Sequence, residues 1–207
     1  MSAGSEHVDR RDGGAGKRGR DADWWTSLGY HGVWQVFGLG LPTIWLAFQS
    51  PTTANLLGPA AIAGIYGLAL GIAAGRQGVL RGDWPRLSRR KLGTGVGYRR
   101  VLRRHCLVAG TLALATFGGV LVGRVGGAVV AGATGLVVSL AGAVAFPRLS
   151  DDDQRALVGR ACLYTAGLAV TVLVARPLDP ATAITSAPLT LAFLAATAVV
   201  DLRQSVA

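Results

Sequence analysis

Three consecutive aspartates, at positions 151–153, are the residues of this sequence best suited to chemistry. Adjacent carboxylates can hold Mg²⁺ and, through it, a diphosphate. Enzymes that work in this way usually have a second acidic cluster, which the sequence lacks. Ser150 followed by Asp153 instead fits a capping box, and acids in a first helical turn suit the positive end of the helix. We therefore expect these acids to begin a helix, with a lipid-modifying site at the membrane surface as an alternative.

Four side chains could act as metal ligands, namely His31, His105, Cys106 and Cys162. Zinc sites generally contain closely spaced pairs such as C-x-x-C, and these four residues show no such spacing. His105 and Cys106 are adjacent, so their side chains point apart on a helix. GTGVG at 93–97 lacks the third glycine and the Lys-Ser/Thr pair of phosphate-binding loops. The sequence therefore predicts no catalytic, cofactor-binding or metal-binding residues and no cofactor.

The segments around these residues are predominantly apolar. Of the 207 residues, 51% are hydrophobic and 15% are charged, whereas soluble domains contain about 25% charged residues. Apolar segments cover 33–48, 54–75, 106–122, 125–146, 159–175 and 181–200. Each has close to the ~17–25 residues that cross a bilayer core, without the alternating polarity of a β-barrel. Because GRVGG at 123–127 interrupts the longest apolar block, we predict two spans there, joined by a glycine turn.

The distribution of Lys and Arg tests this interpretation independently. With six spans, 19 of the 21 basic residues fall on one side of the membrane, and only Arg124 and Arg176 fall on the other. Cytoplasmic loops carry such an excess, so both termini are predicted to be cytoplasmic. Among Asp, Glu, Lys and Arg, only Arg160 lies inside an apolar segment. It is one residue from the segment end, where we expect it to reach the membrane surface.

The predicted fold is all-α, a polytopic integral membrane protein with a bundle of six transmembrane helices in three hairpins, N-in/C-in. The transmembrane domain covers 24–203, after a disordered cytoplasmic tail at 1–23 and before a short tail at 204–207. A basic cytoplasmic loop covers 76–104. The spans are expected at about 31–49, 54–75, 105–122, 125–146, 158–175 and 181–201.

Two sets of residues have predicted contacts. Basic residues of the cytoplasmic loop are expected to bind anionic lipid headgroups, since a negative surface attracts each charge by ~1 kcal/mol. They are Arg86, Arg89, Arg90, Lys91, Arg99, Arg100, Arg103 and Arg104. Glycines at four-residue spacing are expected to allow close helix packing. They are Gly67, Gly71, Gly75, Gly119, Gly123 and Gly127.

The function that these observations favour is a non-catalytic scaffold or accessory subunit of a membrane assembly. Hydroxyl groups are the main polar groups deep in the spans, which argues against an ion-coupled transporter. A permease or channel for a neutral or weakly polar solute is the first alternative, and a lipid-modifying enzyme is the second. The expected partners are an anionic bilayer and a membrane protein or second copy. Nucleic acid is not expected, because no aromatic platform accompanies the basic loop. Arg outnumbers Lys 19 to 2, which is typical of a GC-rich prokaryotic genome, and the expected location is the plasma membrane.

Overall fold

The computed structural model describes residues 26–50, 54–79, 95–177 and 186–206, and every regular element in these ranges is a helix. In chain order the elements are η1 (Ser27–Val33), α2 (Trp34–Gln49), α3 (Ala54–Arg76), α4 (Gly95–Leu149), α5 (Gln154–Ala175) and α6 (Ala187–Val206). The all-α prediction is thereby confirmed. The predicted tail at 1–23 and most of the loop at 76–104 lie outside the described residues.

Among the described residues, three helices are long and apolar enough to cross a membrane. They are α3, most of α4 (Gly97–Leu149) and α5. The apolar composition of these helices is not explained by burial inside the protein. Large apolar side chains such as Ile62, Val129 and Val137 are more than half exposed on its outer surface. Apolar side chains on the outside of a bundle are expected where lipid is the surrounding solvent.

Helix α4 contains a reversal of the chain. Gly127 has non-helical torsion angles, φ 78° and ψ −173°, which glycine adopts far more readily than residues with a Cβ. The halves before and after it pack against each other, so that Gly123 contacts Ala131. Farther along, Gly142 contacts Thr111. The contacts pair residues progressively farther from Gly127 on both sides, which is the pattern of antiparallel helices.

Small residues bring α3 close to the second half of α4. A Cβ added at Gly67 would lie 3.0 Å from a Leu136 methyl group, and one added at Gly71 would collide with the Ala143 Cβ. Gly75 is buried one turn farther along α3. In α4, Gly119 lies so close to Ala131 that an added Cβ would be 2.8 Å from its carbonyl oxygen. Of the predicted packing glycines, Gly127 alone lies in the turn, where an added Cβ has no neighbour within 4 Å.

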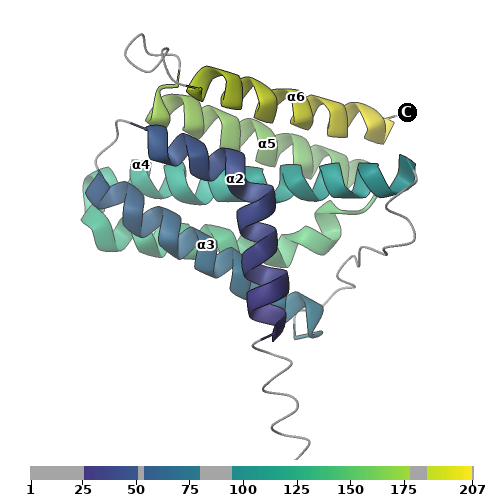
Figure 1. Ribbon diagram of the computed structural model, residues 1–207, viewed down its shortest axis with the longest axis horizontal. Helices are drawn as coiled ribbons and strands as arrows, with labels where there is room; N and C mark the ends of the chain where they lie inside the picture. Colours follow the sequence, from purple (N-terminus) through teal and green to yellow (C-terminus); the bar gives the residue numbers. More distant parts are fainter. Residues whose placement is uncertain (1–25, 51–53, 80–94, 178–185, 207) are drawn as a thin grey trace, which may run out of the picture.

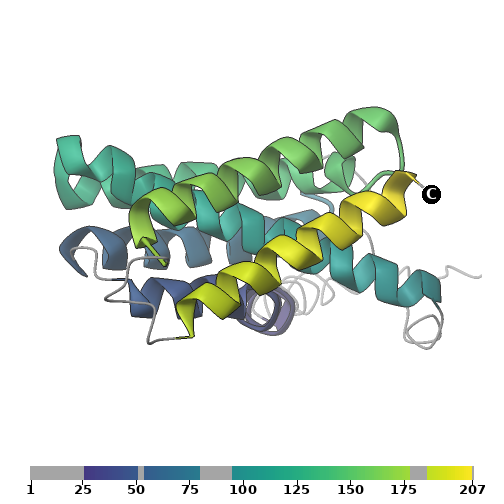
Figure 2. The same cartoon turned by 90° about the horizontal axis from the view of Figure 1, so that it is seen from above.

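The long axes of α3, α4, α5 and α6 are roughly aligned, but η1 and the first part of α2 are not aligned with them (Figure 1). The ribbon of η1 and the first part of α2 stands across the bundle and is seen nearly end-on in Figure 2. Pro42 lies inside α2, and proline removes a backbone hydrogen bond and favours a bend. The span predicted at 31–49 is therefore divided by a change of direction. The exposed aromatic residues of η1 and α2 include Tyr30, Trp34, Phe37, Trp45 and Phe48.

Replacing Gly135 by Ala tests the close approach of α3 and α4. A Cβ at this position would lie 2.5 Å from the Ala60 carbonyl oxygen, and such overpacking costs about 1–3 kcal/mol. Gly118→Ala is the matched control, because its nearest neighbour would be a Leu114 methyl group at 3.8 Å. Unfolding with SDS in mixed micelles should show a lower free energy of unfolding for Gly135→Ala. Gly118→Ala should have an unchanged or higher value. Equal effects of the two substitutions would contradict the packing.

Candidate functional site

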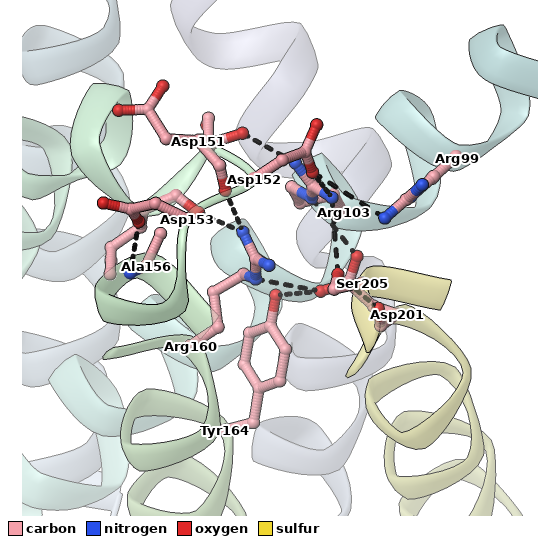
Figure 3. Close-up of polar contacts among 12 residues, drawn as sticks. Arg99, Arg103, Asp151, Asp152, Asp153, Ala156, Arg160, Tyr164, Asp201 and Ser205 are labelled. Atoms are coloured by element: carbon pink, nitrogen blue, oxygen red, sulfur yellow. Dashed lines mark hydrogen bonds and ion pairs between the residues drawn. The ribbon is translucent and has the colours of Figure 1, made fainter. Parts of the chain in front are cut away.

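Charged side chains from three helices meet at one end of the bundle (Figure 3). We call Arg103, Asp152, Arg160, Tyr164 and Asp201 the arginine–aspartate cluster. Arg103 lies in the first half of α4, Arg160 lies near the start of α5 and Tyr164 one turn farther along it, and Asp201 lies in the last turns of α6. Asp152 is in the short connection between α4 and α5. The antiparallel course of α4, α5 and α6 brings these segments to the same end of the molecule.

Asp201 is the centre of the cluster and is fully buried. Its Oδ2 accepts a hydrogen bond of 2.9 Å from the Tyr164 hydroxyl and lies 3.6 Å from Arg160 Nε. Its Oδ1 lies 3.5 Å from Arg103 Nε. A carboxylate removed from water is stable only when cations and hydrogen-bond donors replace the lost hydration. Asp201 thus ties the end of α6 to both α4 and α5.

Arg160 is also fully buried, with an exposed fraction of 0%. Its Nη1 donates hydrogen bonds of 2.7 Å to the carbonyl oxygens of Leu149 and Asp151. These contacts attach the start of α5 to the end of α4 while Nε faces Asp201. The expectation that Arg160 reaches the membrane surface is wrong, because a buried carboxylate and two carbonyl oxygens bind its guanidinium inside the bundle.

Arg103 is 7% exposed and joins the buried part of the cluster to the surface. Its Nη2 donates a hydrogen bond of 2.6 Å to Asp152 Oδ1, and its Nη1 donates one of 2.6 Å to the Ser150 carbonyl oxygen. Arg99, one turn earlier in α4, places its Nη2 3.7 Å from the same Asp152 oxygen. The Asp152 side chain is 72% exposed. It lies between two guanidinium groups that would otherwise repel each other.

The three consecutive aspartates have separate structural roles. Asp153 is the N-cap of α5, and its side chain accepts a hydrogen bond of 2.7 Å from the Ala156 backbone N–H. Asp151 contributes its carbonyl oxygen to Arg160, and Asp152 binds Arg103. The Ser150 hydroxyl donates back to the Phe146 carbonyl oxygen at 2.8 Å. The acids do begin a helix, but Asp153 rather than Ser150 is the capping residue.

The predicted lipid-contact residues lie in different surroundings. Arg100 is exposed and Arg99 is partly exposed, whereas Arg103 and Arg104 are buried. The Arg104 guanidinium lies over the Phe146 ring, 5.7 Å from its centroid, a favourable cation–π arrangement. The remaining four, Arg86, Arg89, Arg90 and Lys91, lie outside the described residues.

The possible metal ligands of the described residues are not gathered into a site. Cys106 is buried in α4, and Cys162 is exposed on α5. The His105 ring packs edge-on against Phe193, with the ring centroids 5.7 Å apart. The described part of the chain contains no group of three or more His, Cys, Asp or Glu residues that could hold a metal ion.

A small cavity lies next to the arginine–aspartate cluster, between α4, α5 and α6. Its volume is about 20 Å³, which is space for about one water molecule. Most of the lining is apolar, with polar atoms from Cys106, Tyr164, Thr171 and Thr197. A cavity of this size does not make a passage for a solute.

Sequence reasoning missed Asp201 and Tyr164 and misplaced Arg160. The sequence carries two signals that could have identified them. Arg160 and Tyr164 are four residues apart, so they lie on one face of a helix, as do Asp201 and Ser205. Asp201 also follows the end of the last apolar segment, and Arg160 lies at the start of the preceding one. In a helical hairpin these two positions lie at the same end, where an acid and a base can pair.

Comparison with known protein families gives a match. A family model described as "Domain of unknown function (DUF8215)" matches residues 20–152. This is more than half of the chain. The chain belongs to this family. The DUF8215 match includes Arg103 and Asp152 and stops before Arg160. No curated protein and no solved structure matches the chain.

The pH dependence of stability tests the contact between Arg103 and Asp152 in this DUF8215 protein. The hydrogen bond from Arg103 holds the pKa of the Asp152 carboxyl below its usual range. Burial opposes this shift, and the charges of Arg103, Arg99 and Arg160 act in the same direction as the hydrogen bond. A lowered pKa means that the ionised carboxylate stabilises the fold at pH values above about 4, and that this contribution is lost as the pH falls through the folded-state pKa.

Asp152→Asn should therefore melt at a lower temperature than the wild type at pH 7, and the difference should shrink toward pH 3. Thermal unfolding in detergent at a series of pH values measures it. Asp151→Asn makes the same charge change at the neighbouring exposed residue and should follow the wild type throughout. A deficit of Asp152→Asn that is constant with pH would contradict the ion pair.

Proposed function

We propose that the chain is a non-catalytic scaffold or accessory subunit of a membrane assembly. The observation that carries this proposal is the use of the charged groups in the arginine–aspartate cluster. Arg103 and Arg160 bind two aspartates and three backbone carbonyl oxygens. These contacts join α4, α5 and α6 to one another. Guanidinium groups held in this way stabilise a fixed helix arrangement, which is what a protein needs in order to present a constant surface to a partner.

The proposed topology has six membrane crossings in three hairpins, with both termini in the cytoplasm and the plasma membrane as location. The asymmetry of 19 against two basic residues supports it. So does the gathering of the start of α4, the start of α5 and the end of α6 at one end of the bundle (Figure 3). In the first proposed crossing, η1 and the first part of α2 lie across the bundle. Tyr30 and Trp34 are exposed there, as aromatic residues at a membrane interface are.

The two alternative functions have less support. A permease or channel needs a path for its solute. The cavity beside α5 has room for about one water molecule, and the larger hollow of about 510 Å³ between α2 and α6 is an open groove with a mostly apolar lining. A lipid-modifying enzyme would need available carboxylates at 151–153. There, Asp152 is bound by Arg103, and Asp153 caps α5.

Photocrosslinking tests the scaffold proposal. Each of three variants carries a crosslinking amino acid at one exposed apolar position. The positions lie on different helices and are Phe48 in α2, Val137 in α4 and Leu189 in α6. Leu112, which is 1% exposed, is the control. After irradiation of native membranes, we expect one helix face to give a discrete adduct with a second polypeptide or a second copy, and Leu112 to give none. Lipid adducts alone from every face, together with a monomeric particle in detergent, would contradict the proposal.

A further inference from the structure

Two arginines of α4 converge on one surface oxygen. Arg99 Nη2 lies 3.7 Å and Arg103 Nη2 lies 2.6 Å from Asp152 Oδ1. The Asp152 side chain is 72% exposed, in contrast to the fully buried Asp201 on the inner side of Arg103. The outer carboxylate is thus reached from solvent, whereas the inner one is not (Figure 3).

The position of Arg103 does not depend on Asp152. Its Nη1 is held by the Ser150 carbonyl oxygen at 2.6 Å, and its Nε faces Asp201 at 3.5 Å. Its Nη2 also lies 3.4 Å from the Ser205 hydroxyl oxygen. Loss of Asp152 would therefore leave the Nη2 donor pointing at the same place. The Arg99 side chain is 36% exposed, so it can follow an anion that binds there.

The charges at this end favour an anion with more than one oxygen. In the ion pairs of the described residues, three guanidinium groups at this end face only two carboxylates. The guanidinium groups belong to Arg99, Arg103 and Arg160, and the carboxylates to Asp152 and Asp201. Arg100, next to Arg99 in the sequence, is exposed. A phosphate group offers two or three oxygens to guanidinium donors, whereas both arginines reach the same Asp152 oxygen, Oδ1. Arginine pairs bind phosphate with good geometry because each guanidinium presents several donors in one plane.

We propose that Arg99 and Arg103 form a phosphate-binding site, in which Asp152 is a built-in competitor that phosphate displaces. The ligand class is a phosphomonoester or phosphodiester, as in an anionic lipid headgroup. The inference rests on the proposed membrane location and adds to it a defined headgroup site and its regulation. Displacement frees the Asp152 side chain from α4, while Arg103 stays bound to the Ser150 carbonyl oxygen and to Asp201.

Lipid titration of the full chain in detergent, followed by native mass spectrometry, tests the site. The probes are phosphatidylglycerol and the zwitterionic phosphatidylcholine. Asp152→Asn should bind one phosphatidylglycerol about fivefold more tightly than the wild type, which corresponds to the ~1 kcal/mol that one surface charge contributes. Asp151→Asn adds the same charge one residue away and should change the affinity much less. Asp152→Glu restores a carboxylate and should bind like the wild type.

A second variant identifies the arginine that responds. Arg99→Gln combined with Asp152→Asn should lose the gain, while the melting temperature of each variant shows that it is folded. Equal gains for Asp151→Asn and Asp152→Asn, or equal binding of the two lipids by Asp152→Asn, would overturn the site. These results would leave the scaffold proposal intact, because photocrosslinking tests that independently.

Inorganic phosphate distinguishes the two sources of the ligand. If the lipid is the natural ligand, millimolar inorganic phosphate should leave phosphatidylglycerol bound to Asp152→Asn. Displacement by inorganic phosphate at that concentration would support a phosphate site that is filled from solution and would overturn the lipid source. Fractionation of each variant with membranes confirms its location before either titration.

Discussion

The removal of guanidinium groups from water is the constraint on which the arrangement of α4, α5 and α6 depends. Arg103 and Arg160 are buried at one end of an apolar bundle, where an unpaired charge would cost several kcal/mol. Asp201, on a different helix from both, lies within 3.6 Å of each. Because the partners come from three helices, the charges are compensated only when all three helices end at the same level. The electrostatic requirement thus fixes the axial register of the bundle.

The other side of the bundle is held by a different kind of contact. Between α3 and the second half of α4, glycines replace larger side chains, and backbone atoms approach closely, as at Gly135 and Ala60. In lipid the hydrophobic effect does not drive helices together, so van der Waals contact and polar pairs must. The chain uses close contact for α3 and α4 and ionic contact for α4, α5 and α6. The cluster is then both a structural device and, through Asp152, a point where an external anion has access.

Features that depend on local composition, such as the apolar helices and the break between two of them, could be predicted from the sequence. Apolar segments of adequate length predict helices, and GRVGG at 123–127 predicts a break, which the structure has at Gly127. Local chemistry also predicts that the acids at 151–153 begin a helix. The choice of Asp153 over Ser150 as N-cap was not predictable, because the Ser150 hydroxyl binds the preceding turn instead.

Features that depend on two distant segments could not be predicted in this way. Arg160 and Asp201 are at the ends of separate apolar segments, and each alone is compatible with a side chain that reaches the membrane surface. Only the packing of α5 against α6 turns both inward. The change of direction in α2 is similar, since proline occurs in straight and in bent membrane helices, and the packing of α2 against α3, α4 and α6 joins segments that are distant in the sequence.

A double-mutant cycle on Arg160 and Asp201 measures most directly whether the buried ion pair holds the helices together. Arg160→Met and Asp201→Leu should each lower the free energy of unfolding by about 3–5 kcal/mol, because each removes one charge of a buried pair and the remaining contacts compensate the other charge only in part. The double variant should lose clearly less than the sum of the two. Arg155→Met, at an exposed position, should change the value little. Additive losses, or single losses no larger than that of Arg155→Met, would contradict the account.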